Sequence, residues 1–70
     1  MPTEVFSEDV ANTGEERITI SALRDGEFGV VCVSIRRGGF AATFTVNVGV
    51  ARRMAGRIND AAAAAADPSR

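Results

Sequence analysis

Hydrophobic and polar residues alternate with a period of two along three stretches of the chain, Arg17–Leu23, Glu27–Arg36 and Phe40–Val46. This period is typical of β-strands that bury one face. Asp25-Gly26 and Gly38-Gly39 lie between the stretches, and such residue pairs favour two-residue hairpin turns. The pattern therefore predicts an antiparallel β-meander.

The two predicted hairpins assign the same side chains to one face of the sheet. With Asp25-Gly26 as the loop, Ile20 lies opposite Val31, and with Gly38-Gly39 as the loop, Val31 lies opposite Val46. A slip of one residue in either hairpin would mix apolar and polar side chains. The predicted buried face consists of Ile18, Ile20, Ala22, Val31, Val33, Ile35, Phe40, Ala42, Phe44 and Val46.

After the third stretch the apolar period changes to that of a helix. Asn47 is a good N-cap, and Asp67-Pro68 is expected to end the helix, which gives a predicted span of residues 48–66 and a tail of residues 67–70. Its apolar side comprises Val50, Met54, Ile58, Ala61, Ala62 and Ala65. The tract Ala61–Ala66 either faces solvent or packs on a partner subunit, and we favour the partner.

Residues 1–16 have two interpretations. Thr3–Val10 has the composition of a fourth, edge strand, with Asn12-Thr13-Gly14 as its turn. The alternative is a flexible arm. The predicted fold class is therefore α+β, a single domain with a three- or four-stranded antiparallel meander and one C-terminal helix packed on one face.

A domain of 70 residues has a small hydrophobic core that contributes only a few kcal/mol and usually needs a further stabilising device. Cys32 is the only cysteine and the chain has no histidine, so neither an internal disulfide nor a zinc site can be assembled. Association of subunits remains, and we expect a homodimer. We expect no metal and no cofactor.

The sequence favours a cytoplasmic protein, because it has no apolar run long enough for a membrane and no apolar leader. Its basic residues are all arginine, and alanine is abundant. This bias suggests a GC-rich genome, such as that of an actinobacterium or one of its phages.

The charges are divided unevenly along the chain, although the formal net charge is only −1. Residues 1–27 contain seven acidic residues, whereas residues 28–57 contain five arginines and no acidic residue. The basic part either neutralises the acidic part within the fold or the dimer, or forms a surface that faces an anion.

Catalytic chemistry is poorly represented. The chain has no His, Lys, Tyr or Trp, which removes the usual general bases and most nucleophile systems. We expect Cys32 to be a small buried hydrophobic residue, and the acidic pairs Glu8-Asp9 and Glu15-Glu16 to be solvated loop residues. Gly38-Gly39 follows two arginines but joins two strands, so a hairpin is expected rather than a phosphate-binding P-loop. We therefore expect no enzyme.

The segment Phe44–Met54, a strand that runs directly into an amphipathic helix, resembles the corresponding junction of the PUR repeat family, and the resemblance covers about residues 4–62. It implies a β4α unit that pairs by exchanging helices and binds single-stranded DNA or RNA. It also implies that Arg17, Thr19, Ser34 and Arg36 on the open sheet face contact the nucleic acid. The segment from Ala51 onward equally resembles short actinobacterial and actinophage proteins with a β-hairpin and an alanine-rich helix.

The sequence thus predicts a small homodimeric binding module that binds single-stranded nucleic acid. The candidate contact residues are Arg17, Thr19, Ser34, Arg36, Arg37, Arg52 and Arg53. The alternative is a protein-interaction module, such as a phage-encoded modulator of a host protein, which docks through the apolar residues Leu23, Phe28 and Val30.

Overall fold

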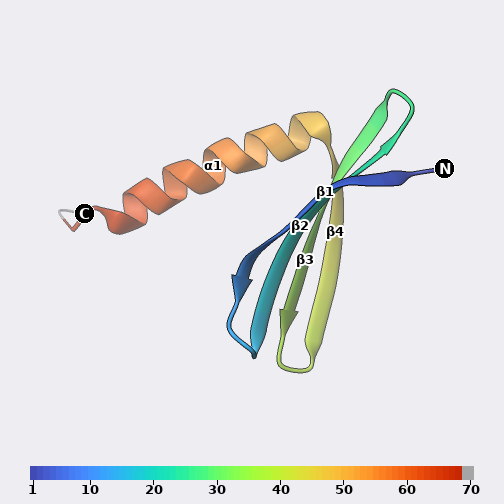
Figure 1. Cartoon of the computed structure of the whole chain (residues 1–70). Coiled ribbons are helices and arrows are strands. Elements are labelled where there is room, and N and C mark those ends of the chain that lie inside the picture. The colour runs from blue at the N-terminus through green and yellow to red at the C-terminus, as the bar shows by residue number, and fades with distance from the viewer. Residues whose placement is uncertain (69–70) are drawn as a thin grey trace.

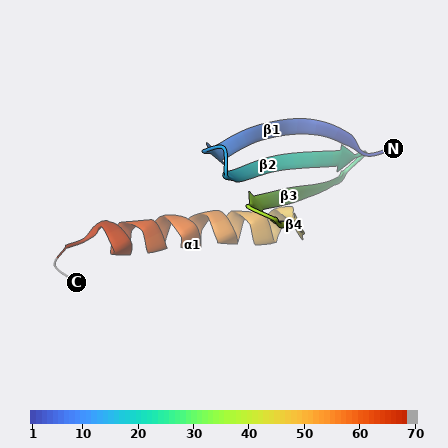
Figure 2. The ribbon, with the colours of Figure 1, turned by 90° about the horizontal axis from the view of Figure 1, so that it is seen from below.

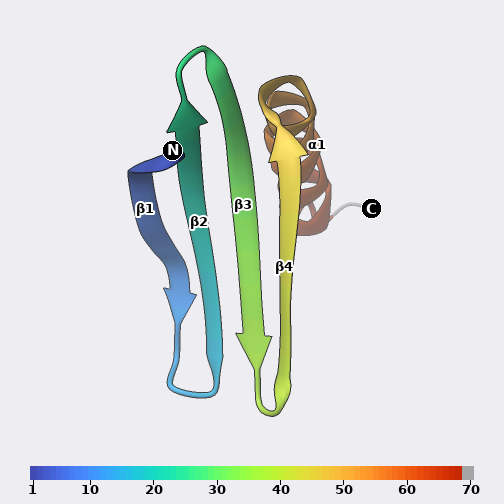
Figure 3. The same cartoon turned by 90° about the vertical axis from the view of Figure 1, so that its right-hand side faces the viewer.

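The structure is a computed structural model that describes residues 1–68. Four antiparallel strands form one sheet in the order β1-β2-β3-β4, and one helix follows the last strand (Figures 1 and 3). The elements are β1 (Thr3–Asn12), β2 (Glu16–Asp25), β3 (Phe28–Arg37), β4 (Phe40–Asn47) and α1 (Val48–Ala66). The predicted α+β meander is confirmed, with four strands.

The β3–β4 hairpin has the predicted register, with Val31 opposite Val46. The β2–β3 register is shifted by two residues from the prediction, because Ile20 lies opposite Val33 rather than Val31. The loop is Gly26-Glu27, and Gly26 has a φ of 61° at the first loop position, where a type II′ turn requires glycine. A shift of two residues keeps every side chain on its predicted face.

The N-terminal segment is the edge strand β1, not a flexible arm. It pairs with β2 throughout, with register shifts between Glu4 and Phe6 and between Asp9 and Ala11. These shifts are β-bulges, at Val5 and Val10, and they bend the edge strand. Asp9 and its neighbour Glu8 therefore lie within a strand, and the expectation that they are loop residues is wrong.

Helix α1 begins and ends where the sequence predicts. The side chain of the N-cap residue Asn47 accepts a hydrogen bond of 2.8 Å from the backbone N–H of Val50, which satisfies one free donor of the first turn. At the other end, the backbone N–H of Asp67 donates to the carbonyl of Ala64 over 3.3 Å. Of the predicted tail, residues 69–70 lie outside the described part of the chain. No helix within residues 1–68 is long and apolar enough to span a membrane.

The helix contacts β3 and β4 near its start and then diverges from the sheet (Figures 1 and 2). An apolar cleft of about 220 Å³ lies between the two layers. The sheet side of the cleft is formed by Ile20, Val31, Val33 and Val46, and the helix side by Ala51, Met54, Ala55 and Ile58. The helix thus packs on the predicted face but leaves much of that face uncovered.

No residue among those described is fully buried in the single chain. The predicted buried face is at best half-buried, and three large side chains of this face and of the facing helix are mostly exposed: Phe40 at 63%, Phe44 at 54% and Ile58 at 63%. The expectation of a buried face is therefore wrong for one chain alone. The cause is the divergence of α1, which leaves the inner face without a cover.

The single chain is also much more extended than a compact domain. Its radius of gyration is 14.3 Å, whereas a compact chain of this length would have about 11 Å. Its accessible surface is 5749 Å², about 1,500 Å² more than a compact monomer of the same mass exposes. The single chain therefore leaves much of its apolar surface uncovered.

Candidate functional site

The open face of the sheet carries a regular array of polar side chains. Strand register places one residue of each strand in each row across this face. The rows are Asn12–Arg17–Arg36–Ala41, Asp9–Thr19–Ser34–Thr43, Ser7–Ser21–Cys32–Thr45 and Glu4–Leu23–Val30–Asn47. The side chains of the two middle rows are small and project little from the sheet. Most of them end in a hydroxyl group.

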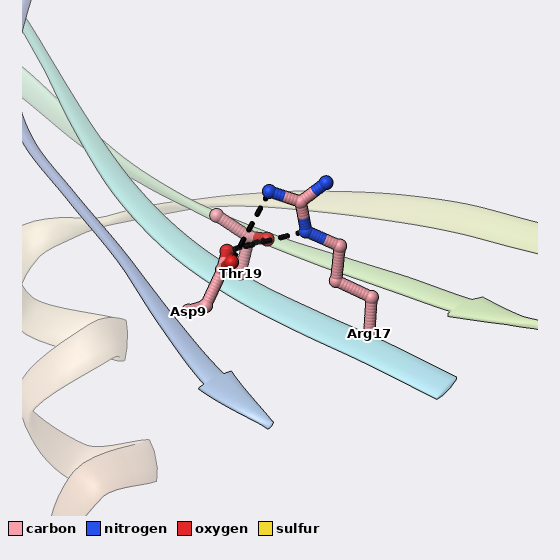
Figure 4. Close-up of polar contacts among 3 residues, drawn as sticks. All are labelled: Asp9, Arg17 and Thr19. Carbon is pink, nitrogen blue, oxygen red and sulfur yellow. Dashed lines mark hydrogen bonds and ion pairs between the residues drawn. The ribbon is translucent and has the colours of Figure 1, made fainter. Parts of the chain in front are cut away.

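Asp9, Arg17 and Thr19 form a hydrogen-bonded cluster on this face (Figure 4). The guanidinium group of Arg17 donates two hydrogen bonds to the Asp9 carboxylate, from Nε over 3.3 Å and from Nη2 over 3.1 Å. The hydroxyl of Thr19 donates a third, over 2.8 Å. This forked geometry fixes the direction in which Arg17 points.

The cluster also shifts the titration of the carboxyl group. The hydrogen bond from Thr19, followed by that from Arg17, lowers the pKa of Asp9 below its ordinary value of 3.8. Both donors favour the ionised form. Asp9 therefore keeps its negative charge at neutral pH and neutralises one of the arginines on the open face.

Arg17 and Arg36 lie directly opposite each other on β2 and β3. Like charges at such positions repel each other. Arg17 has Asp9 as a counter-ion, but the guanidinium group of Arg36 makes no hydrogen bond and no ion pair within residues 1–68. The guanidinium group of Arg36 is therefore available to bind an anion.

The two arginines border a hollow of about 360 Å³ at the end of the sheet, between the β1–β2 and β3–β4 turns. The backbone N–H of Gly38 donates to the carbonyl of Glu15 over 3.0 Å and ties these two turns together. Asn12, Gly14, Glu15, Glu16 and Gly38 complete the lining. The Glu16 carboxylate is paired with Arg37, so the hollow is bordered by both basic and acidic residues.

The hydroxyl groups of the middle rows are linked across β3 and β4. The hydroxyls of Ser34 and Thr43 are 3.1 Å apart, and Cys32 Sγ lies 3.6 Å from the Thr45 hydroxyl. Cys32 is half-buried on the open face, so the expectation that it is a buried hydrophobic residue is wrong. Cys32 alternates along β3 with apolar residues of the inner face. Its side chain therefore lies on the open face, among the hydroxyl groups.

The remaining predicted contact residues lie elsewhere. Arg37 points to the other face of the sheet and forms an ion pair of 3.5 Å with Glu16. Arg52 and Arg53 are exposed in the first turns of α1, and this helix starts at the opposite end of β4 from the β3–β4 turn. One chain therefore brings together Arg17, Thr19, Ser34 and Arg36, but not the other three arginines.

The predicted apolar patch forms at the opposite end of the open face. Leu23 and Val30 lie opposite each other in one row, and Phe28 beside them is 84% exposed. Pro2 closes a shallow hollow of about 190 Å³ over these residues. The patch is small, and Phe28 is its one strongly exposed side chain.

Asp9 is the member of the hydrogen-bonded cluster that sequence reasoning missed. Its alternation with Ser7 in a β-rich stretch is the pattern that could have placed it on a strand face, but the bulge at Val10 breaks that alternation.

Comparisons with protein-family models, with curated proteins and with solved structures found no match. Within residues 1–68, no group of three or more acidic or cysteine side chains is placed to hold a metal ion.

Proposed function

We propose that the protein is a homodimeric, non-catalytic module that binds single-stranded nucleic acid on the open face of its sheet. The observation that carries the proposal is the pair Arg17 and Arg36, side by side at the end of a face lined by hydroxyl groups. The absence of histidine, lysine and tyrosine from the sequence supports a binding role rather than catalysis.

The chemistry of this face suits a phosphate backbone. Arginine binds phosphate oxygens through two parallel hydrogen bonds, and serine and threonine hydroxyls donate to phosphate and sugar oxygens. Arg36 has no internal partner among the described residues, so it can bind a phosphate without first losing an ion pair. Because Phe28 is the only exposed aromatic ring that residues 1–68 place on this face, we expect backbone contacts to contribute more than base stacking.

The uncovered inner face supports the homodimer. The excess surface of about 1,500 Å² per chain corresponds to about 3,000 Å² in a dimer, which lies within the range of permanent homodimer interfaces. The protruding helix and the resemblance to PUR repeats favour the same arrangement, in which the apolar side of α1 reaches the other subunit.

Sedimentation of the protein with a labelled single-stranded oligonucleotide, at about 50 and about 200 mM salt, tests the proposal. We expect a dimer that binds the oligonucleotide and releases it as salt rises, because phosphate contacts displace counter-ions. Arg36→Ala should weaken binding and reduce the slope of log K against log salt concentration by about one.

Arg57→Ala is the matched control for Arg36→Ala. It removes the same charge from the outer side of α1, where Arg57 forms an ion pair of 3.7 Å with Asp60. Equal effects of the two substitutions would contradict a specific role for the sheet face. Failure to bind the oligonucleotide at either salt concentration would contradict nucleic-acid binding altogether.

A second candidate function rests on the patch formed by Leu23, Phe28 and Val30. A ring that is 84% exposed beside a hollow suits docking to another protein, for example a host protein modulated by a phage. This alternative predicts partner binding that changes little with salt and is lost in Phe28→Ser. Retention of a co-purified partner by Phe28→Ser would contradict it.

A further inference from the structure

The two edges of the sheet differ in how they are protected from pairing with another strand. Edge strand β1 carries the acidic residues Glu4, Glu8 and Asp9, and it has bulges at Val5 and Val10. Charges and bulges at an edge are devices that prevent the addition of a further strand. The β1 edge is therefore protected.

Edge strand β4 has none of these devices. Its eight residues, Phe40–Asn47, include no charged residue, no proline and no glycine. Its register with β3 is continuous from end to end. An uncharged, regular edge rich in β-branched and aromatic residues is a template for another strand.

The side chains of β4 are exposed in the way that a missing neighbour would explain. On the inner face, Phe40 is 63% and Phe44 54% exposed. These rings lie at the border of the apolar face, next to the open edge, so a further strand would extend that face beside them. The same border is where α1 diverges from the sheet (Figure 2).

We propose that β4 pairs antiparallel with β4 of a second copy of the chain, about a twofold axis at Thr43, so that two four-stranded sheets become one sheet of eight strands. This inference rests on the homodimer of the proposed function and specifies its geometry. It does not depend on nucleic-acid binding.

Face alternation restricts the register of this pairing. Residues that lie opposite each other in an antiparallel pair have side chains on the same face, so the axis passes through a residue and not between two. An axis at Thr43 places Phe40 opposite Val46 of the partner subunit and Ala42 opposite Phe44 of the partner subunit. Each ring then faces a smaller side chain, a pairing of the kind that stabilises sheets.

The pairing has two consequences for the rest of the fold. A twofold axis perpendicular to the sheet keeps both α1 helices on the inner side, where their apolar sides and the two inner faces can close a common core. The open faces join into one surface. Because the strands are antiparallel, the Arg17–Arg36 rows lie at opposite ends of that surface.

Disulfide trapping tests the pairing without disturbing the fold. In a Cys32→Ala background, Thr43→Cys places one thiol per subunit on the proposed axis, where opposite Cβ atoms are about 4.5–5.5 Å apart. A disulfide forms with little movement from such a position. Ser7→Cys is the control, because Ser7, like Thr43, is an exposed residue on the open face, but on the protected edge.

We expect mild oxidation to convert most of the Thr43→Cys protein, and little of the Ser7→Cys protein, into a covalent dimer. The reduced variants are sedimented in parallel. A non-covalent dimer in which Thr43→Cys does not cross-link, or cross-links no better than Ser7→Cys, would overturn the edge pairing and leave the homodimer intact. A monomer at all protein concentrations would overturn both.

Discussion

Arg17 and Arg36 lie directly opposite each other on neighbouring strands, yet only Arg17 is bound to a carboxylate, that of Asp9. Within the described residues 1–68, the open face therefore has one neutralised and one unpaired guanidinium group in the same row. This asymmetry sets an order among the contacts that an anion can make. An anion would bind Arg36 first and would compete with Asp9 for Arg17.

Replacement of Asp9 by asparagine should strengthen nucleic-acid binding. Asp9→Asn removes a negative charge from the open face and frees Arg17 for phosphate. Exposed ion pairs are weak, so we expect only roughly two- to fivefold tighter binding of a single-stranded oligonucleotide at fixed salt.

Asp60→Asn is the control for this gain. It removes the same charge from α1, where Asp60 forms an ion pair with Arg57. The comparison is made by titrating the labelled oligonucleotide with each variant. If Asp9→Asn bound no more tightly than Asp60→Asn, Asp9 would not restrain Arg17.

The same carboxylate should make stability depend on pH. The pKa of Asp9 is lowered in the folded protein by Thr19 and Arg17. A carboxyl group of this kind stabilises the fold above its unfolded pKa, and that contribution is lost as the pH falls through the lower, folded value. Between about pH 6 and about pH 3, the urea midpoint should therefore fall further for the wild type than for Asp9→Asn.

The measurement is urea unfolding followed by circular dichroism at one fixed protein concentration, because the midpoint of a dimer depends on concentration. The two proteins differ only at residue 9, so contributions from the rest of the chain cancel in the difference. Parallel pH dependences of the two proteins would show that the Asp9 cluster does not stabilise the fold.

Gly38 and Gly39 should respond differently to alanine, although they are neighbours in one turn. Gly38 has a φ of 56°, whereas Gly39 is not in the positive region, and a methyl group added there would meet no atom within 4 Å. Gly38→Ala should cost about 1–2 kcal/mol, because a Cβ atom is disfavoured at positive φ. Gly39→Ala should change the free energy of unfolding by less than about 0.5 kcal/mol.

Thermal or urea unfolding of the two variants decides this prediction. Equal destabilisation by both would mean that the turn conformation differs from the one described, with both glycines at positive φ. Little effect of either would mean that the turn adapts without cost.

The sequence identified the strands of the meander, the Gly38-Gly39 turn and the helix bounds because each depends on local chemistry. Two hairpins agreed on the face of Val31, and Asn47 and Asp67 mark the ends of α1. The predicted β2–β3 register was wrong because a loop of Asp25-Gly26 and a loop of Gly26-Glu27 both fit the alternation of apolar and polar residues. The registers that these two loops set differ by two residues.

Two other features could not be predicted from local patterns. The bulge at Val10 displaces the alternation of β1, so the sequence did not reveal that Asp9 shares a face with Arg17. The helical period showed which side of α1 is apolar, but not what covers that side. Helix α1 diverges from the sheet (Figure 1), which leaves Ile58 63% exposed in the single chain.

Phe44 and Phe28 offer a matched test of the uncovered inner face. Both rings are exposed in the single chain, at 54% and 84%, but Phe44 lies on the inner face and Phe28 on the open face. In a monomer, replacing either exposed ring would change stability little. In the proposed dimer, Phe44→Ser removes two rings from the interface, each worth about 1.5–3 kcal/mol on full burial.

We therefore expect Phe44→Ser to raise the dissociation constant of the dimer at least about tenfold, which corresponds to about 1.4 kcal/mol, and Phe28→Ser to leave it unchanged. Sedimentation over a range of protein concentrations measures the constant, and circular dichroism verifies that each variant retains its strands. If Phe28→Ser dissociated the dimer and Phe44→Ser did not, the subunits would meet through the open face. That outcome would remove the surface on which nucleic-acid binding has been proposed, because the second chain would occupy it.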